Sequence, residues 1–136
     1  MSLTETQEHL DYLKKIGFEK HLKKITKKLK DKKIVLYGAG TFFKVIYDNF
    51  DLSGLNIIGI SDKRFEEHED NEEFCGYKVV APKEMKELNP DYILVGTLKF
   101  VRIIENFYED MFKGSKIKIK PLIKKPLREL WLEFRS

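Results

Sequence analysis

The sequence predicts a three-layer α/β fold built around a mainly parallel sheet. Three short segments dominated by apolar residues, 34–37, 57–60 and 91–96, are separated by stretches with helical spacing. Apolar runs of this length are typical of parallel strands that are buried on both faces. Because crossovers between parallel strands are right-handed, alternating strands and helices favour a five-stranded sheet in the order 3-2-1-4-5.

The other elements follow from the spacing of apolar residues and from turn residues. Helices are expected over 4–16, 18–29, 41–50, 82–88 and 98–111 and from Pro126 onward, and further strands over 76–80 and 116–120. The first two helices and the last one are amphipathic. Lysine and isoleucine alternate strictly in 116–120, which indicates an edge strand with one face in water.

Length and composition indicate one globular unit. The chain has 136 residues, of which 42% are hydrophobic, and this is enough for a single core. We expect an N-terminal helical segment, 1–31, that packs on an α/β domain, 32–136. Cys75 is the single cysteine, and the sequence contains no apolar run of roughly 18 residues and no signal peptide. A cytoplasmic protein without a membrane partner is therefore expected.

The net charge of +4 is unevenly distributed. Ten lysines lie within 14–33, and six acidic residues lie within 66–73. The lysines fall on the polar side of an apolar helical stripe and have no aromatic residues between them. A solvated surface is therefore favoured over a nucleic-acid partner.

The residues after the first predicted strand are typical of a phosphate-binding turn. Gly38-Ala39-Gly40 follows the strand directly, and Thr41 and Phe42 open a helix. Backbone N–H groups and the positive end of a helix dipole favour a phosphate at such a position. Gly38 would permit the tight turn, Gly40 the close approach of the anion, and Thr41 a further donor or a helix cap. The alternative is that both glycines only close a tight turn.

The glycine pattern departs from the dinucleotide fingerprint at one position. In G-x-G-x-x-G the third glycine allows the helix to pack closely on the strand, and here Phe43 stands in its place. A helix that stands farther from the sheet is the expected consequence.

A second group of candidate residues follows the second predicted strand. Asp62 lies 22 residues after Gly40, where an acidic side chain can accept hydrogen bonds from ribose hydroxyls. The alternative role for Asp62 is to cap the turn 61–64. Lys63 and Arg64 are placed to neutralise an additional phosphate, so the sequence leaves plain and phosphorylated ribose open.

The strand 91–96 should end at the same edge of the sheet. Gly96 and Thr97 would then line the crevice beside the first strand, where α/β sheets bind ligands. Lys99 is expected to be a solvated lysine rather than a ligand contact.

The sequence shows no complete catalytic site. No tyrosine is followed four residues later by lysine, and neither the phosphate-loop nor the nucleophile-elbow pattern occurs. His9, His21 and His68 have no metal-ligand spacing to one another or to Cys75, so we expect surface histidines and no metal. The only candidates for a donor or base are Lys99 and Tyr37, and whether the chain is an enzyme stays open.

Residues 33–122, about two thirds of the chain, resemble a known group of domains. The likeness lies in the two glycines of the turn, in "IGISD" ending at Asp62, in "GYKVV" followed by a proline-started helix, and in "PDYILVGT". The segment is similar to Rossmann-like domains of bacterial surface-polysaccharide proteins. These include the N-terminal domain of acyltransferases that act on UDP-sugars, and domains described as nucleoside-diphosphate-sugar epimerase-like or CoA-binding-like.

The resemblance implies that Gly38, Gly40 and Asp62 contact the nucleotide portion of a sugar donor. It also implies a possible glycosyltransferase or acyltransferase partner, because no left-handed β-helix follows to supply an acyl-transfer site. The first hypothesis is therefore a nucleotide- or sugar-nucleotide-binding module in surface-polysaccharide metabolism. Alternatives are an NAD(P)-dependent oxidoreductase or epimerase-like subunit that acts on a sugar nucleotide, and a structural interaction domain with a degenerate glycine turn.

The two amphipathic ends of the chain predict self-association. Apolar stripes recur at helical spacing in 18–29 and in 127–134. Burying both stripes within a monomer of this size is difficult, and exposed patches rich in Trp and Phe usually mark contact surfaces. We expect a homodimer with the C-terminal stripe in its interface, and the alternative is that both stripes pack on their own sheet.

Overall fold

The computed structural model describes residues 3–135. Its helices are α1 (Leu3–Lys15), α2 (Phe18–Lys28), α3 (Thr41–Asn49), α4 (Val101–Glu109) and α5 (Leu127–Arg135). Its strands are β1 (Ile34–Tyr37), β2 (Ile57–Ser61), β3 (Glu73–Phe74), β4 (Tyr77–Lys78), β5 (Tyr92–Val95) and β6 (Lys118–Pro121). Short 3₁₀ helices are η1 (Lys63–Phe65), η2 (Pro82–Glu84) and η3 (Lys86–Leu88).

Four of the strands form one parallel sheet in the order β2-β1-β5-β6. β1 and β5 are neighbours, with Ile34 opposite Tyr92, as the apolar runs predict. β6 is an edge strand in which Ile119 is buried and the two lysines beside it are exposed. The sheet therefore brings the ends of β1, β2 and β5 to one edge.

The expected fifth strand, 76–80, is reduced to one bridge. Val79 pairs in parallel with Ile60 of β2, whereas β4 pairs in antiparallel fashion with β3. The reason is the turn between them, where Cys75 and Gly76 have positive φ angles of 53° and 78°. Two consecutive residues of this conformation make a tight hairpin, which turns the segment back on itself. The expected helix 82–88 is also different, because it consists of the two 3₁₀ turns η2 and η3.

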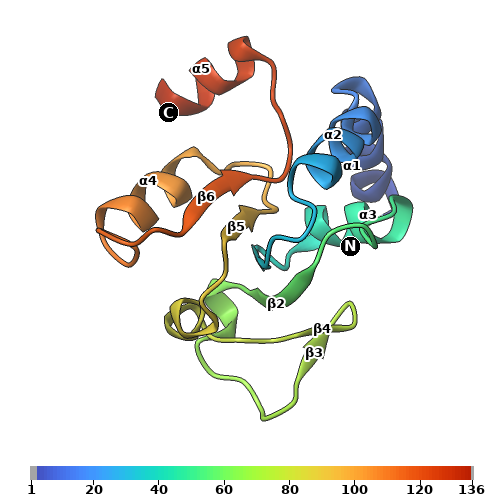
Figure 1. The fold of residues 1–136 in the computed structure, drawn as a ribbon. Helices are drawn as coiled ribbons and strands as arrows, with labels where there is room; N and C mark the ends of the chain where they lie inside the picture. The colour runs from blue at the N-terminus through green and yellow to red at the C-terminus, as the bar shows by residue number, and fades with distance from the viewer. Residues whose placement is uncertain (1–2, 136) are drawn as a thin grey trace.

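Helices cover both faces of the four-stranded sheet. Figure 1 shows α1, α2 and α3 on one side of the sheet and α4 on the other. On the α4 side, the Tyr37 ring packs edge to face on Phe107 with 4.9 Å between ring centroids. On the opposite side, Phe43 of α3 packs against Gly96 at the end of β5. These are the three layers that the sequence predicts.

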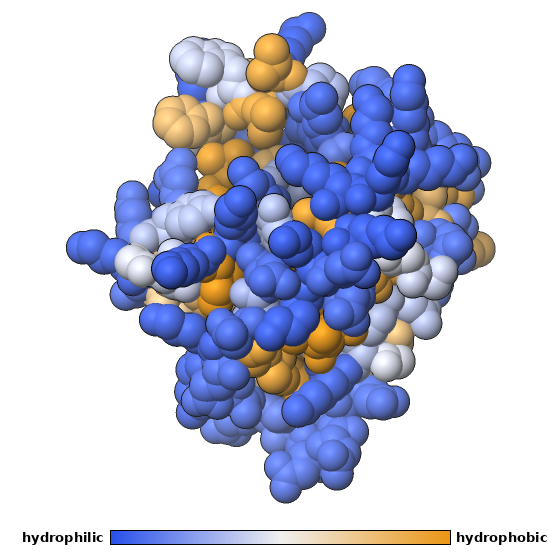
Figure 2. Space-filling view, viewed as in Figure 1, coloured by the Kyte–Doolittle hydropathy of each residue, from blue (hydrophilic) through white to orange (hydrophobic). Residues whose placement is uncertain are grey.

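The two amphipathic ends of the chain differ in burial. Phe18, Leu22 and Leu29 of the N-terminal stripe belong to the core, and the Phe18 ring packs edge to face on Phe50 at 4.9 Å. The C-terminal stripe on α5 is exposed. Four large apolar side chains have exposed fractions from 56% to 85%: Leu127, Trp131, Leu132 and Phe134. Hydrophobic side chains accordingly gather over α5 at the top of Figure 2, whereas hydrophilic residues cover most of the rest of that face.

Two contacts fasten α5 to the body of the domain. Lys125 pairs with Glu133 in an almost fully buried ion pair, and the Lys125 Nζ atom lies 5.0 Å from the centre of the Phe100 ring. Glu133 also accepts a hydrogen bond from the backbone N–H of Val101 at 2.7 Å, which joins α5 to the start of α4. Within residues 3–135, no helix has the length and apolar character needed to cross a bilayer.

Candidate functional site

The first half of the glycine turn is fixed by the protein itself. Gly38 has a φ angle of 107°, which side chains rarely allow, and a Cβ atom there would lie 2.6 Å from Cγ2 of Thr97. Its backbone N–H donates to the carbonyl of Ser61 at 2.8 Å. Glycine is therefore required at this position by conformation and by packing, whatever the turn binds.

The second half of the turn is open. Gly40 is exposed, has an extended conformation with a φ angle of −90°, and would have no atom within 4 Å of an added Cβ. It occupies the N-cap position of α3 without a side-chain cap among residues 3–135. The backbone N–H groups in the first turn of a helix lack partners within the helix. At α3 the N-cap residue itself supplies no side-chain partner for them, and the space beside Gly40 is open.

Asp62 holds the turn in place. One carboxylate oxygen, Oδ2, accepts from the backbone N–H of Ala39 at 2.6 Å, and Oδ1 accepts from the backbone N–H of Arg64 at 3.1 Å. The Arg64 guanidinium donates to the carbonyl of Ala39 and lies 5.1 Å and 5.2 Å from the rings of Phe65 and Phe74. Asp62 thus caps η1, which is the alternative that the sequence left open, and it also joins the ends of β1 and β2.

Helix α1 covers one flank of the turn. The Thr41 hydroxyl donates to a carboxylate oxygen of Glu5 at 3.4 Å, and the His9 ring packs edge to face on the buried Phe42 at 5.2 Å. A carboxylate of the chain itself therefore lies at the positive end of the α3 dipole. Lys63 is exposed on the other flank.

The end of β5 reaches the glycine turn. Gly96 donates its backbone N–H to the carbonyl of Tyr37 at 2.8 Å, and a Cβ atom at Gly96 would lie only 3.1 Å from Cδ1 of Phe43. The small residue that lets α3 pack on the sheet therefore lies on the strand, opposite Phe43, instead of on the helix. This exchange corrects the expectation that a phenylalanine at this place holds the helix away from the sheet.

Of the candidate residues after Gly96, Thr97 faces the glycine turn and Lys99 does not. The Thr97 side chain faces Gly38 through its methyl group, and its hydroxyl donates to the carbonyl of Lys99 at 2.7 Å. Lys99 is exposed and lines a surface depression with Val101 and Phe134, at the junction of α4 and α5. The structure thus brings Gly96 and Thr97 to the glycine turn and places Lys99 with other residues.

A family model matches the part of the chain that holds the glycine turn. The model of the C2185-like N-terminal family matches residues 30–119. The chain belongs to this family. The C2185-like region contains β1, the glycine turn, Asp62 and Gly96, whereas all of α1, α2 and α5 lie outside it. No curated protein and no solved structure is significantly similar to the chain.

Tyr37 lies within the C2185-like region but is a poor candidate for a base. Burial, with smaller contributions from Asp62 and Glu66, raises the pKa of its phenol above the ordinary value of 10.0. A phenol with a raised pKa remains protonated near neutral pH and accepts a proton poorly. Its ring also packs against Phe107, on the α4 face of the sheet.

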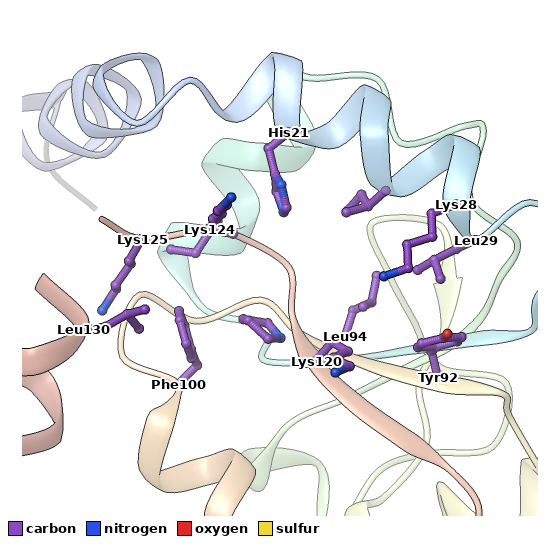
Figure 3. Close-up of a pocket in the computed structure, with 13 residues that line it drawn as sticks. His21, Lys28, Leu29, Tyr92, Leu94, Phe100, Lys120, Lys124, Lys125 and Leu130 are labelled. Carbon is purple, nitrogen blue, oxygen red and sulfur yellow. The ribbon is translucent and has the colours of Figure 1, made fainter. Parts of the chain in front are cut away.

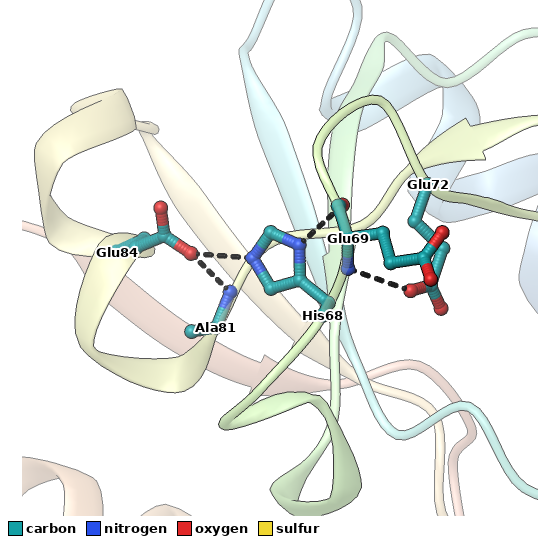
Figure 4. A network of polar contacts seen from close by, with 5 residues as sticks. All are labelled: His68, Glu69, Glu72, Ala81 and Glu84. Atoms are coloured by element: carbon teal, nitrogen blue, oxygen red, sulfur yellow. Dashed lines mark hydrogen bonds and ion pairs between the residues drawn. The ribbon is translucent and has the colours of Figure 1, made fainter.

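The C2185-like region also holds a polar network that sequence reasoning missed. His68 Nε2 lies 2.7 Å from Oε1 of Glu84, and Nδ1 lies 2.9 Å from the carbonyl of Glu69, as Figure 4 shows. The same Glu84 oxygen accepts from the backbone N–H of Ala81 at 2.7 Å. Because both ring nitrogens face oxygen acceptors, the network suits the doubly protonated imidazolium. His68 therefore ties the acidic loop 66–73 to η2.

The titration of the network follows from these contacts. The hydrogen bond to Glu84 raises the pKa of His68 above its ordinary value of 6.5, and the same bond lowers the pKa of Glu84 below 4.5. No spacing rule links His68 to Glu84, so the sequence carries no signal for the pair. Within residues 3–135, no group of three or more His, Cys, Asp or Glu side chains is arranged to hold a metal ion.

Proposed function

We propose that this chain binds a nucleotide-type ligand, with a sugar nucleotide as the favoured candidate, by placing a phosphate group at the N-terminus of α3. The observation that supports the proposal is the position of Gly40. A side chain at this residue would meet nothing in the protein, and Gly40 itself contributes no side-chain cap to α3. Its lack of a side chain is explained if a ligand approaches the backbone there.

The contrast between the two glycines strengthens this interpretation. Gly38 is needed for the turn itself, because a Cβ atom there would collide with Thr97. At Gly40 the φ angle suits any residue, and Ser, Asp or Asn would cap the helix better than glycine. The protein forgoes that stabilisation at the edge of the sheet where α/β folds bind their ligands.

The proposed role is that of a binding module. Tyr37 and Lys99, the two candidates for a base, are respectively packed on the α4 face and placed at the α4–α5 junction. The resemblance to domains of surface-polysaccharide proteins suggests that a separate glycosyltransferase or acyltransferase performs the chemistry. We further infer that the Val79 bridge is the remnant of a third strand, so that the fold is a Rossmann-like sheet in the order 3-2-1-4-5.

Isothermal titration of the intact chain with UDP, UDP-sugars, NAD, NADP and coenzyme A tests the proposal. Tighter binding of UDP-sugars than of the others supports the favoured candidate. Preference for NAD or NADP would support the oxidoreductase alternative instead. If none binds at millimolar concentration, the proposal is wrong.

Two variants at one position locate the site. Gly40→Asp and Gly40→Asn introduce side chains of nearly equal size, and both cap α3 well. Only aspartate adds a negative charge where the phosphate would bind. We expect both variants to fold at least as stably as the parent chain, and Gly40→Asp to bind the phosphate ligand about tenfold or more weakly than Gly40→Asn. Equal affinities of the two variants for the phosphate ligand would place the phosphate elsewhere. If both variants also bind a protein partner as the parent chain does, the structural interaction domain is favoured.

A further inference from the structure

A separate cavity lies on the opposite flank of the domain from the acidic loop. It opens to solvent between α2, β5, β6 and the chain segment that leads into α5, and its volume is about 270 Å³. In Figure 3, His21, Lys28 and Leu29 extend from α2 toward the strands that carry Tyr92 and Leu94. None of the residues of the glycine turn lines it.

The walls of the cavity are mainly apolar. The apolar and aromatic residues that line it are Ile25, Leu29, Tyr92, Leu94, Phe100, Pro121, Ile123 and Leu130. Because a dry cavity of about 150 Å³ is large enough for benzene, this one accommodates an aromatic ring with a short chain. It is at the lower limit of pockets that bind drug-sized ligands, which start at roughly 300 Å³. A whole nucleotide sugar exceeds it.

The charged groups around the cavity all have the same sign. Lys28, Lys120, Lys124 and Lys125 line it, and no aspartate or glutamate of the described chain, residues 3–135, does. Lys125 is neutralised by Glu133. Within residues 3–135, no ion pair involves Lys28, Lys120 or Lys124, which are exposed at its rim. The rim therefore offers three cations without an anionic partner.

His21 reports on this positive field. Its ring lines the cavity from α2. Burial, followed by the charge of Lys124, lowers the pKa of His21 below its ordinary value of 6.5, and Lys24 contributes in the same direction. The hydrogen bond to the carbonyl of Leu122 acts in the opposite direction. Burial and the two lysines outweigh the hydrogen bond to Leu122, so the neutral form of the His21 imidazole is favoured.

We propose that this cavity binds a small amphipathic anion, which places an aromatic or short aliphatic body between α2 and β5 and a single carboxylate or phosphate at the lysine rim, which Lys28, Lys120 and Lys124 form. An inorganic anion alone should bind weakly, because it has no apolar group that could cover the apolar walls of the cavity. The lysine rim disfavours neutral and cationic ligands of the same shape. The combination selects molecules that carry both features.

The test uses five probes and the intact chain. Binding of 4-phenylbutyrate, octanoate and phenyl phosphate is measured by NMR titration, with benzyl alcohol and inorganic phosphate as probes that carry only one of the two features. We expect at least one of the three amphipathic anions to bind about tenfold or more tightly than either single-feature probe. Preference for phenyl phosphate or for the two carboxylates identifies the anionic group. If benzyl alcohol binds as tightly as the two carboxylates, or if inorganic phosphate displaces the carboxylates at a similar concentration, the cavity does not select amphipathic anions and the proposal is wrong.

The titration of His21 gives an independent readout. A bound anion beside the ring opposes the field of Lys124 and raises the pKa of His21, whereas burial of the ring under an apolar body lowers it. The imidazole resonances are therefore followed against pH with saturating 4-phenylbutyrate and with saturating benzyl alcohol, which has an aromatic body but no charge. The pKa of His21 should be higher with 4-phenylbutyrate, and equal values with the two probes would overturn the proposal, even if binding is observed.

Matched variants locate the ligand without disturbing the core. Lys120→Gln and Lys124→Gln remove exposed charges at the rim, whereas Lys86→Gln removes an exposed charge on η3, away from the cavity. Each rim variant should weaken binding about threefold to tenfold, and Lys86→Gln should leave it unchanged. Equal effects of all three would reveal nonspecific attraction and refute the proposed site.

A cavity-filling variant tests the apolar half. Ile25→Trp should abolish binding of the probe, while Ile25→Leu should preserve it because the volume is retained. If Ile25→Trp does not fold, the lysine variants and the His21 titration still decide the matter. The site is also distinguishable from the nucleotide site, because Gly40→Asp should not change the affinity for the two carboxylate probes.

Discussion

Replacement of Asp62 by alanine distinguishes a residue that holds the fold from one that binds ribose. In the structure, both carboxylate oxygens of Asp62 are engaged, Oδ2 with the backbone N–H of Ala39 at 2.6 Å and Oδ1 with that of Arg64 at 3.1 Å. Asp62→Ala removes the acceptor from both N–H groups. The two strands that meet at this edge then lose one of the polar connections between their ends, while the bond from Gly38 to the Ser61 carbonyl remains.

The magnitude follows from the kind of hydrogen bond. A bond to a charged group contributes about 1.5–3 kcal/mol, and the two bonds made by Asp62 share one carboxylate at a partly buried position. Solvent can replace part of the bond to Arg64, which is exposed. We therefore expect Asp62→Ala to lower the free energy of unfolding by about 2–4 kcal/mol. Asp62→Asn, which keeps one acceptor oxygen, should lower it by about half as much.

Urea denaturation followed by circular dichroism measures these differences, provided that the m-value is unchanged. Asp48→Asn is the matched control, because Asp48 is exposed and makes a 3.5 Å ion pair with Lys44. Surface pairs of this kind contribute about 0–1 kcal/mol, so the control should hardly change stability. If Asp62→Ala is as stable as the control while ligand affinity falls, Asp62 binds ligand and does not hold the turn.

Three further predictions concern other parts of the chain. Gly38→Ala should destabilise the fold by about 2 kcal/mol or more in urea denaturation, because of its positive φ angle and the 2.6 Å approach of Thr97, and a parent-like stability would show that the turn is not constrained as described. The hydrogen bond to Glu84 raises the pKa of His68, and this contributes stability that is present below pH 6.5 and is lost as the pH rises through the folded value. Glu84→Gln removes the charged partner, so the NMR titration of His68 should shift toward 6.5, and no shift would disprove the pairing. Trp131→Glu should convert a homodimer to a monomer in light scattering, and a monomeric parent chain at tens of micromolar would end the case for self-association through α5.

The sequence predicts the sheet well because its signals are local. The runs 34–37, 57–60 and 91–96 become β1, β2 and β5 within a residue or so at each end, and the alternating lysines mark β6 as an edge. β1 and β5 are largely buried on both faces, so the composition of these two strands alone reveals their state. The glycines after β1 mark the turn for the same reason.

The predicted third strand, 76–80, is present only as the Val79 bridge, because a short turn draws the preceding residues into a hairpin instead of into pairing with β2. Positive φ angles at Cys75 and Gly76 fold the chain into a hairpin, and only Val79 then reaches β2. A two-residue turn ending in glycine between apolar residues is a recognised hairpin signal, so the sequence did contain the necessary information. The sequence gives no indication, however, that Cys75, a residue other than glycine, adopts a positive φ angle.

The partners of Asp62 and the lysine-rimmed cavity could not be predicted from spacing. Asp62 and Ala39 are 23 residues apart, and the cavity joins α2 to residues about a hundred positions later in the chain. Such contacts depend on how the elements pack in three dimensions. The exposure of α5 is similar, because the stripes in α2 and α5 have the same periodicity and only packing decides which one is buried.

The glycine turn combines a rigid half with an open half, and this division is what a binding site requires. Asp62 engages the N–H of Ala39, and the Arg64 guanidinium engages its carbonyl, so the peptide groups before Gly40 are held in one orientation. The donors of the first α3 turn then point to a fixed place without first having to be ordered. Binding loses less conformational entropy at such a preorganised position than at a mobile loop. The same carboxylate that holds the turn therefore favours the proposed phosphate site without touching the ligand.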